Sequence, residues 1–141
     1  MLSKVSVYSL GEKPHSKKLL AIAENLGQKL IAQLEKGEQA CPDKNIHSMN
    51  GYFCEVFLVD KEIMDKNVLS FPAPKDFPHP DLEQQPLGEI YLNPEVIQSQ
   101  GHDLEALLIH GFLHLLGYDH QGKDDTISMQ EQEQKLLHAF C

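Results

Sequence analysis

Residues 109–121 read IHGFLHLLGYDHQ, and this stretch decides which fold and which site the chain can form. His110 and His114 are four residues apart, a spacing that places both imidazoles on one face of a helix, about one turn apart. Gly117 accepts the left-handed conformation that ends helices, so the chain can turn there. His120 follows three residues later and can fold back toward the same point. The segment therefore predicts three imidazoles that converge at the end of a helix.

Three converging imidazoles are typical of a catalytic metal site, because they leave at least one position open on a zinc-like ion. We expect one ion per chain, held by His110, His114 and His120. Zinc bound in this way lowers the pKa of a bound water to about 7. The same ligands also suit nickel and copper, so the spacing does not choose the metal. The alternative is that the three histidines are ordinary polar residues of an amphipathic helix, but burying imidazoles among leucines requires partners.

The spacing HxxxHxxGxxH is similar to that of the metzincin proteases, which carry HExxHxxGxxH. Gly111 stands where those proteases have their glutamate general base. Because glycine cannot take up or pass on a proton, peptide hydrolysis by that route is disfavoured. A phosphodiester remains an accessible substrate, since a metal ion can activate an attacking hydroxyl and offset charge on the phosphoryl oxygens.

Outward from this segment, the apolar spacing predicts strands mostly in the middle of the chain and helices at both ends. We expect one helix from the N-cap Ser16 to near Gly37, a second from Asp103 to Leu115, and a last one from Asp124 or Asp125. Strands are expected near residues 5–8, 53–59, 68–71 and 87–92. Five prolines within residues 72–86 predict an exposed loop or flap without regular structure. The pattern indicates a single α+β domain over residues 1–141.

The length of 141 residues fits one domain, and the composition excludes wholesale disorder. No apolar run is long enough to cross a membrane and no signal peptide is apparent, so we expect a cytoplasmic protein whose three cysteines are free thiols. The formal net charge is −9, and all 12 basic residues are lysines. This balance argues against a protein that coats nucleic acid non-specifically, while a local basic groove remains compatible with it.

At this point the chain resembles a known family. HGFLHLLGYDH (110–120) is similar to the signature of the YbeY family of bacterial endoribonucleases and rRNA maturation factors. VLSFP (68–72) resembles the end of that family's TDVLSFP segment, and LGEIYLNPE (87–95) resembles its LGDIxIxxE segment. The resemblance covers roughly residues 50–137, and residues 1–49 agree in pattern alone.

The resemblance implies an α+β fold in which helices pack on a small mixed four-stranded sheet. It implies one zinc ion on His110, His114 and His120, at the end of a helix. The implied activity is single-strand-specific, metal-dependent endoribonuclease activity in 3′-end processing of small-subunit rRNA and in ribosome quality control. The implied partners are rRNA, the small ribosomal subunit and a ribosome-associated GTPase, with no membrane.

Two departures from the family pattern bear on substrate binding. The segment before Val68 is short and lacks the family's arginine, and Asn67 stands in place of an aspartate. Lys66 can supply a positive charge there, but without the fork geometry of a guanidinium. Two alternatives therefore stay open: a ribosome assembly factor that keeps the metal site without cutting RNA, and a metallohydrolase of another class.

Other polar residues are candidates for contacts around the metal or are interpreted as solvated side chains. Asp119 is a candidate partner for the second nitrogen of a ligand imidazole. Ser70 and Glu89 are candidate contacts for substrate or water in the metal cleft. The acidic pair Glu131 and Glu133 is interpreted as the exposed face of the last helix. The other five histidines are interpreted as solvated side chains: His15, His47, His79, His102 and His138.

Overall fold

The computed structural model describes residues 2–74, 84–119 and 121–141. The predicted ligand His120, the residue His79 and most of the predicted proline-rich flap therefore lie outside the described residues. The elements in chain order are β1 (Lys4–Ser9), α1 (Lys17–Glu35), β2 (Tyr52–Leu58), β3 (Val68–Pro72), β4 (Gln85–Leu92), α2 (Pro94–Ser99), α3 (Leu104–Leu115) and α4 (Lys123–Phe140). Both the α+β class and the predicted placement of the strands are confirmed.

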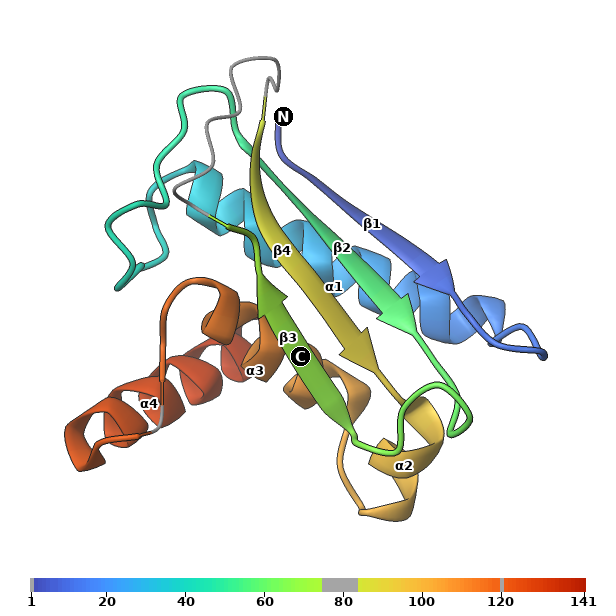
Figure 1. The fold of residues 1–141 in the computed structure, drawn as a ribbon. Helices are drawn as coiled ribbons and strands as arrows, with labels where there is room; N and C mark the ends of the chain where they lie inside the picture. Colours follow the sequence, from blue (N-terminus) through green and yellow to red (C-terminus); the bar gives the residue numbers. More distant parts are fainter. Residues whose placement is uncertain (1, 75–83, 120) are drawn as a thin grey trace.

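The four strands form one mixed sheet in the order β1-β2-β4-β3 (Figure 1). β1, β2 and β4 run parallel, and β3 runs antiparallel to β4. The parallel strands end side by side, so the segments that follow Ser9, Leu58 and Leu92 meet at one edge of the sheet. The mixed four-stranded sheet is therefore confirmed.

The helices gather on one face of this sheet (Figure 1). α1 packs on β1 and β2, α3 packs on β3 and β4, and α4 packs on α3. The core lies between sheet and helices and includes Leu30, Ile90, Leu108 and Phe112, all almost completely buried. None of the helices within the described ranges is both long and apolar enough to cross a membrane.

The predicted limits of the proline-rich loop are wrong at both ends. Pro72 is the last residue of β3, and β4 already begins at Gln85 and includes Pro86. A strand tolerates proline where no ladder hydrogen bond is lost. Pro86 fits that rule, because β4 pairs with β3 only from Gly88 onward.

Helix boundaries follow local capping. Ser16 caps α1 as predicted, and its hydroxyl accepts a hydrogen bond from the Leu19 amide at 3.2 Å. Asp103 occupies the N-cap position of α3, but its side chain makes no capping hydrogen bond. α4 begins at Lys123 after Gly122, slightly before the predicted aspartates.

Candidate metal site

The end of α3 is a hydrogen-bonded glycine turn. Gly117 has a φ of +100°, which the missing side chain permits. Its amide donates to the His114 carbonyl, and the Tyr118 amide donates to the Leu113 carbonyl, both at 3.1 Å. These two bonds form a Schellman motif, which stops the helix and turns the chain back. Tyr118 is thereby returned to the last turn of the helix, beside His114.

His110 and His114 face each other on this last part of α3. Their ring centroids lie 4.6 Å apart with an interplanar angle of 80°, and the two Nε2 atoms are 3.1 Å apart. Both side chains are half-buried. The predicted convergence of this pair is confirmed, whereas the third predicted ligand, His120, lies outside the described residues.

The opposite nitrogen of each ring has an acceptor. His114 Nδ1 lies 3.0 Å from the Tyr118 carbonyl oxygen, and His110 Nδ1 lies 3.1 Å from Glu133 Oε1. A carbonyl or a carboxylate oxygen can only accept, so both Nδ1 atoms carry the proton of these bonds. In the neutral rings, two Nε2 lone pairs then face each other at 3.1 Å, an arrangement that repels unless a proton or a cation lies between them.

This arrangement fits a zinc ion. Two imidazole nitrogens on one tetrahedral zinc lie about 3.3 Å apart, given zinc–nitrogen bonds of about 2.0–2.1 Å. Ligand imidazoles also characteristically donate their other N–H to a carboxylate or a carbonyl. Among the described residues, which do not include His120, no three His, Cys, Asp or Glu side chains form a metal-binding group. The described residues thus include two of the three predicted ligands, His110 and His114.

The pair opens into a cavity of about 630 Å³ between β3 and the end of α3. We call it the histidine cavity; its lining residues are Asn67, Val68, Leu69, Ser70, Pro72, His110, His114, Gly117, Tyr118 and Asp119. Ser70 lines the cavity as predicted, and its hydroxyl donates to the Gly111 carbonyl at 3.0 Å. Asp119 also lines the cavity, but the second nitrogens of His110 and His114 meet Glu133 and the Tyr118 carbonyl rather than Asp119. Asn67 donates from its amide to Gln100 Oε1 at 2.9 Å.

Burial raises the pKa of Tyr118, which lines the same cavity. Its side chain is buried, and its hydroxyl donates to the Ala40 carbonyl at 3.2 Å. The neutral phenol therefore anchors the turn after α3 to the segment that precedes β2, and this contact fixes the carbonyl that His114 uses.

Gly111 lies where α3 comes closest to the sheet. A Cβ atom at this position would be 2.9 Å from Ile90 Cγ2 and 2.9 Å from Ser70 Oγ. A side chain there would meet β3 and β4 and would require the helix to move away from the sheet. The structure thus leaves no room for a glutamate general base at this point of the chain.

Glu89 does not reach the histidine cavity. Ile90, its neighbour in β4, points toward α3, so alternation places Glu89 on the other face of the sheet. There it accepts a hydrogen bond from the Tyr91 hydroxyl at 2.5 Å, and this bond is the largest of the effects that raise the pKa of Tyr91 to about 12. The predicted placement of Glu89 in the metal cleft is therefore wrong, because its side chain lies on the opposite face of β4 from Ile90 and α3.

The sequence-based prediction that Glu133 lies on the exposed face of the last helix is wrong. Its side chain is only 24% exposed and accepts from His110, whereas Glu131 is exposed. The signal was available in the sequence, because Glu133 lies between Met129 and Leu136 at helical spacing, and both of these are buried. A carboxylate within a buried stripe requires a partner.

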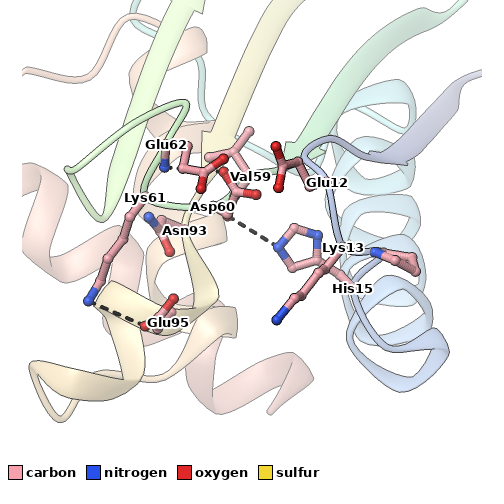
Figure 2. A pocket seen from close by; sticks show the side chains of 10 residues that line it. Glu12, Lys13, His15, Val59, Asp60, Lys61, Glu62, Asn93 and Glu95 are labelled. Carbon is pink, nitrogen blue, oxygen red and sulfur yellow. Dashed lines mark hydrogen bonds and ion pairs between the residues drawn. The ribbon is translucent and has the colours of Figure 1, made fainter.

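A second cavity, of about 340 Å³, lies where the three parallel strands end (Figure 2). We call it the strand-end cavity; it is lined by Glu12, Lys13, Pro14, His15, Val59, Asp60, Lys61, Glu62, Asn93 and Glu95. Its position is the one that open sheets with parallel strands commonly use for ligands. Its histidine, His15, has hydrogen-bond partners at both ring nitrogens, Ser9 Oγ and the Val59 carbonyl.

Comparisons with known proteins place the chain in one family. The family model described as "Endoribonuclease YbeY" matches residues 28–141. A protein named endoribonuclease YbeY from Nitrobacter hamburgensis is 41% identical over 81 residues, which are 50% of this chain and 43% of that protein. One of the same name from a Wolbachia of Drosophila simulans is 36% identical over 105 residues, 67% of this chain and 61% of that protein. The chain spans about half the length of the curated relatives it matches.

Proposed function

Because the chain belongs to the endoribonuclease YbeY family, we propose that it is a metal-dependent endoribonuclease that cuts single-stranded RNA. The observation that carries this proposal is the pair of imidazole nitrogens, His110 Nε2 and His114 Nε2, held 3.1 Å apart at an open cavity. The predicted third ligand is His120. The proposed ion is zinc, one per chain.

The chain's own residues have separable tasks at this site. His110 and His114 would hold the ion through Nε2, because their Nδ1 atoms face Glu133 and the Tyr118 carbonyl. When bound, the ion supplies Lewis acidity toward a water molecule or ribose hydroxyl and toward a phosphoryl oxygen. Asp119 lines the cavity and is placed to receive or orient a polar group of the substrate.

The cavity also bears on the class of substrate. It is open and about 630 Å³ in volume, which admits an extended strand with unpaired bases more readily than a base-paired helix. Gly111 leaves no general base on the helix, which argues for phosphodiesters over peptides. Lys66 directly precedes Asn67 of the cavity wall and is exposed, so we propose it as a contact to the RNA backbone.

The cellular role that we propose is 3′-end maturation of small-subunit rRNA and ribosome quality control in the cytoplasm. The proposed partners are the small ribosomal subunit and a ribosome-associated GTPase. A chain with a net charge of −9 gains little from non-specific attraction to RNA. We therefore propose that a specific contact with a protein partner brings it to its RNA.

Cleavage of a labelled single-stranded RNA by the zinc-loaded protein tests the activity. We expect the wild-type protein to cut the single strand and to spare the same sequence in a duplex. His114→Ala should reduce cleavage to background, whereas the matched control His15→Ala, in the strand-end cavity, should retain it. Failure of the zinc-loaded wild type to cut any single-stranded RNA would refute the nuclease.

A cellular complementation experiment separates the nuclease from an assembly factor that does not cut. If cleavage is the function, unprocessed 3′ ends of small-subunit rRNA accumulate in cells that carry His114→Ala and not in cells that carry His15→Ala. Normal processing with His114→Ala would favour the assembly factor. Peptide cleavage by the zinc-loaded protein would instead point to the other class of metallohydrolase.

A further inference from the structure

Glu133 comes to the metal site from a different element than the histidines. His110 belongs to α3, and Glu133 lies 23 residues later on α4. α4 packs on α3, and its buried residues are Met129 and Leu136. The contact between Glu133 and His110 therefore exists only while α4 is docked on α3.

The two imidazoles differ in how their proton positions are set. His114 Nδ1 meets the carbonyl of Tyr118, which the glycine turn at the end of its own helix delivers. His110 Nδ1 meets Glu133 Oε1 at 3.1 Å, with the carboxylate 24% exposed and the ring 28% exposed. The partner of a ring nitrogen determines which nitrogen carries the proton, so the tautomer of His110 depends on Glu133.

We propose that Glu133 is a positioning residue that holds the Nδ1 proton of His110 and leaves its Nε2 available to the ion. This inference rests on the metal site of the proposed function. It links the docking of α4 to metal affinity, and because such a link is reciprocal, metal binding stabilises the docked helix by the same factor. Removal of a carboxylate that supports a ligand imidazole typically lowers metal affinity by about 10–100-fold.

The tautomer is measured in the metal-free protein by nitrogen NMR of the histidine rings at mildly alkaline pH, where an unperturbed imidazole is neutral. The His110 signals are those that disappear in His110→Gln. We expect the Nδ1–H form in the wild type and in the control Glu131→Ala, and a shift toward the Nε2–H form in Glu133→Ala. A persistent Nδ1–H form in Glu133→Ala would overturn the proposal.

Zinc affinity is measured by competition with a chelating dye, without RNA. Glu133→Ala should weaken zinc binding by about 10–100-fold relative to Glu131→Ala. Glu133→Gln keeps an oxygen that can accept from Nδ1, so it should recover part of the affinity and also guards against a misfolded alanine variant. Equal zinc affinities for Glu133→Ala and Glu131→Ala would refute the positioning role while leaving the nuclease proposal in place.

Amide exchange along α4 tests the reciprocal effect. In the wild type, zinc should slow exchange in α4 by a factor equal to the loss of zinc affinity in Glu133→Ala, and in that variant zinc should have little effect on α4. A purely structural role would change α4 exchange equally with and without zinc. If the tautomer, affinity and exchange results hold but RNA is not cut, the nuclease falls and the role of Glu133 stands.

Discussion

The histidine cavity and the strand-end cavity both contain imidazoles, but the imidazoles differ in their partners. In the strand-end cavity, His15 Nε2 lies 3.2 Å from the Val59 carbonyl (Figure 2). His15 Nδ1 lies 2.7 Å from Ser9 Oγ. The carbonyl can only accept, so Nε2 donates and Nδ1 accepts from the hydroxyl. Both nitrogens of this ring are therefore engaged: Nδ1 bonds to the last residue of β1, and Nε2 joins the segment after β1 to the segment after β2.

In the histidine cavity, by contrast, Nδ1 of each ring meets an oxygen acceptor, and the Nε2 atoms of the two rings face each other. A ring with one nitrogen bonded to a donor and the other to an acceptor has a structural role. Two rings whose Nε2 lone pairs point toward each other are suited to binding a cation. The comparison shows that cavity position alone does not identify a ligand: the strand-end cavity lies where parallel sheets commonly bind ligands, yet its histidine is already engaged.

The largest expected effect is the loss of stabilisation by zinc. At a free zinc concentration of 100 times the dissociation constant, binding adds about 2.7 kcal/mol to the free energy of unfolding. We expect this gain, measured by thermal unfolding and reversed by a chelator, in the wild type and in His15→Ala. It should be absent in His110→Ala and His114→Ala. If His15→Ala abolished the zinc response and His114→Ala preserved it, the zinc site would lie in the strand-end cavity and not in the histidine cavity.

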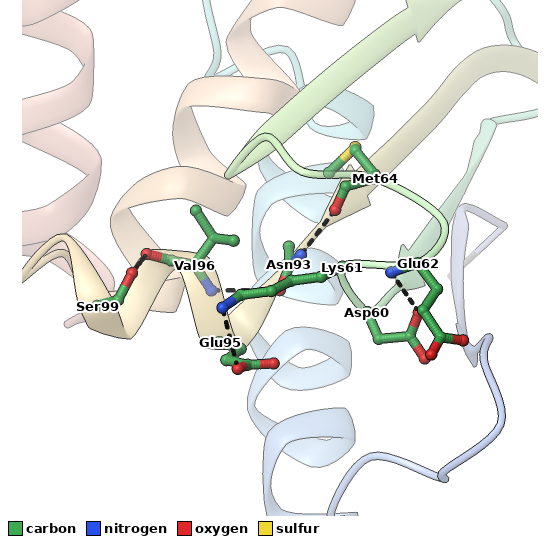
Figure 3. Close-up of polar contacts among 8 residues, drawn as sticks. All are labelled: Asp60, Lys61, Glu62, Met64, Asn93, Glu95, Val96 and Ser99. Carbon is green, nitrogen blue, oxygen red and sulfur yellow. Dashed lines mark hydrogen bonds and ion pairs between the residues drawn. The ribbon is translucent and has the colours of Figure 1, made fainter.

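The next largest effect is expected for the free energy of unfolding when Asn93, which lines the strand-end cavity, is replaced. Asn93 is fully buried; its amide donates to the Met64 carbonyl at 2.8 Å, and its oxygen caps α2 at the Val96 amide (Figure 3). Asn93→Ala removes both bonds and should lower the free energy of unfolding by about 2 kcal/mol, as measured by urea denaturation.

Asn93→Ser is the matched variant for this position. Serine is also a good N-cap, so it should retain the bond to Val96 and lose less stability than alanine. Neither variant should change the zinc response, because Asn93 has a structural role at the strand-end cavity. An unaltered stability of Asn93→Ala, or a lost zinc response, would contradict that assignment.

A smaller effect is expected at Gly111, where α3 comes closest to the sheet. Gly111→Ala brings a methyl group to 2.9 Å from Ile90 Cγ2 and Ser70 Oγ. Overpacking costs about 1–3 kcal/mol, and the better helix propensity of alanine returns about 1 kcal/mol. We therefore expect a net loss of about 1 kcal/mol in urea denaturation, together with weaker zinc binding as α3 moves from β3.

Ser70→Ala provides the control for this crowding. It removes one of the two close neighbours, so the loss caused by Gly111→Ala should be smaller in the Ser70→Ala background than in the wild type. Strictly additive effects would show that the serine oxygen does not limit the approach of the helix.

The part of the site that follows from local chemistry could be predicted from the sequence. The four-residue spacing of His110 and His114 and the left-handed Gly117 act within one helix and its turn, so the convergence of the pair needed no knowledge of the tertiary structure. The strands also followed from composition, and their order in the sheet did not, because pairing depends on contacts between distant segments.

The residues that were misplaced depend on how elements pack. Glu89 lies on the face of β4 opposite to Ile90, and only the position of α3 says which face holds the site. Glu133 reaches His110 because α4 docks on α3, which no local pattern specifies. In both cases the sequence shows which residues share one face of the strand or helix. It does not show which neighbouring element packs against that face.

The smallest effect tests whether the charges around the strand-end cavity are ordinary solvated groups. Lys61 Nζ lies 3.3 Å from Glu95 Oε1, and the two side chains are 58% and 66% exposed (Figure 3). Exposed ion pairs contribute about 0–1 kcal/mol, because water screens the attraction and two long side chains lose freedom. Lys61→Ala, Glu95→Ala and the double variant should therefore give a coupling energy below about 0.5 kcal/mol in urea denaturation, and it should shrink further in high salt. A coupling well above 1 kcal/mol, or a change in zinc affinity in any of the three variants, would mean that this cavity is electrostatically connected to the histidine pair and that the two regions do not act separately.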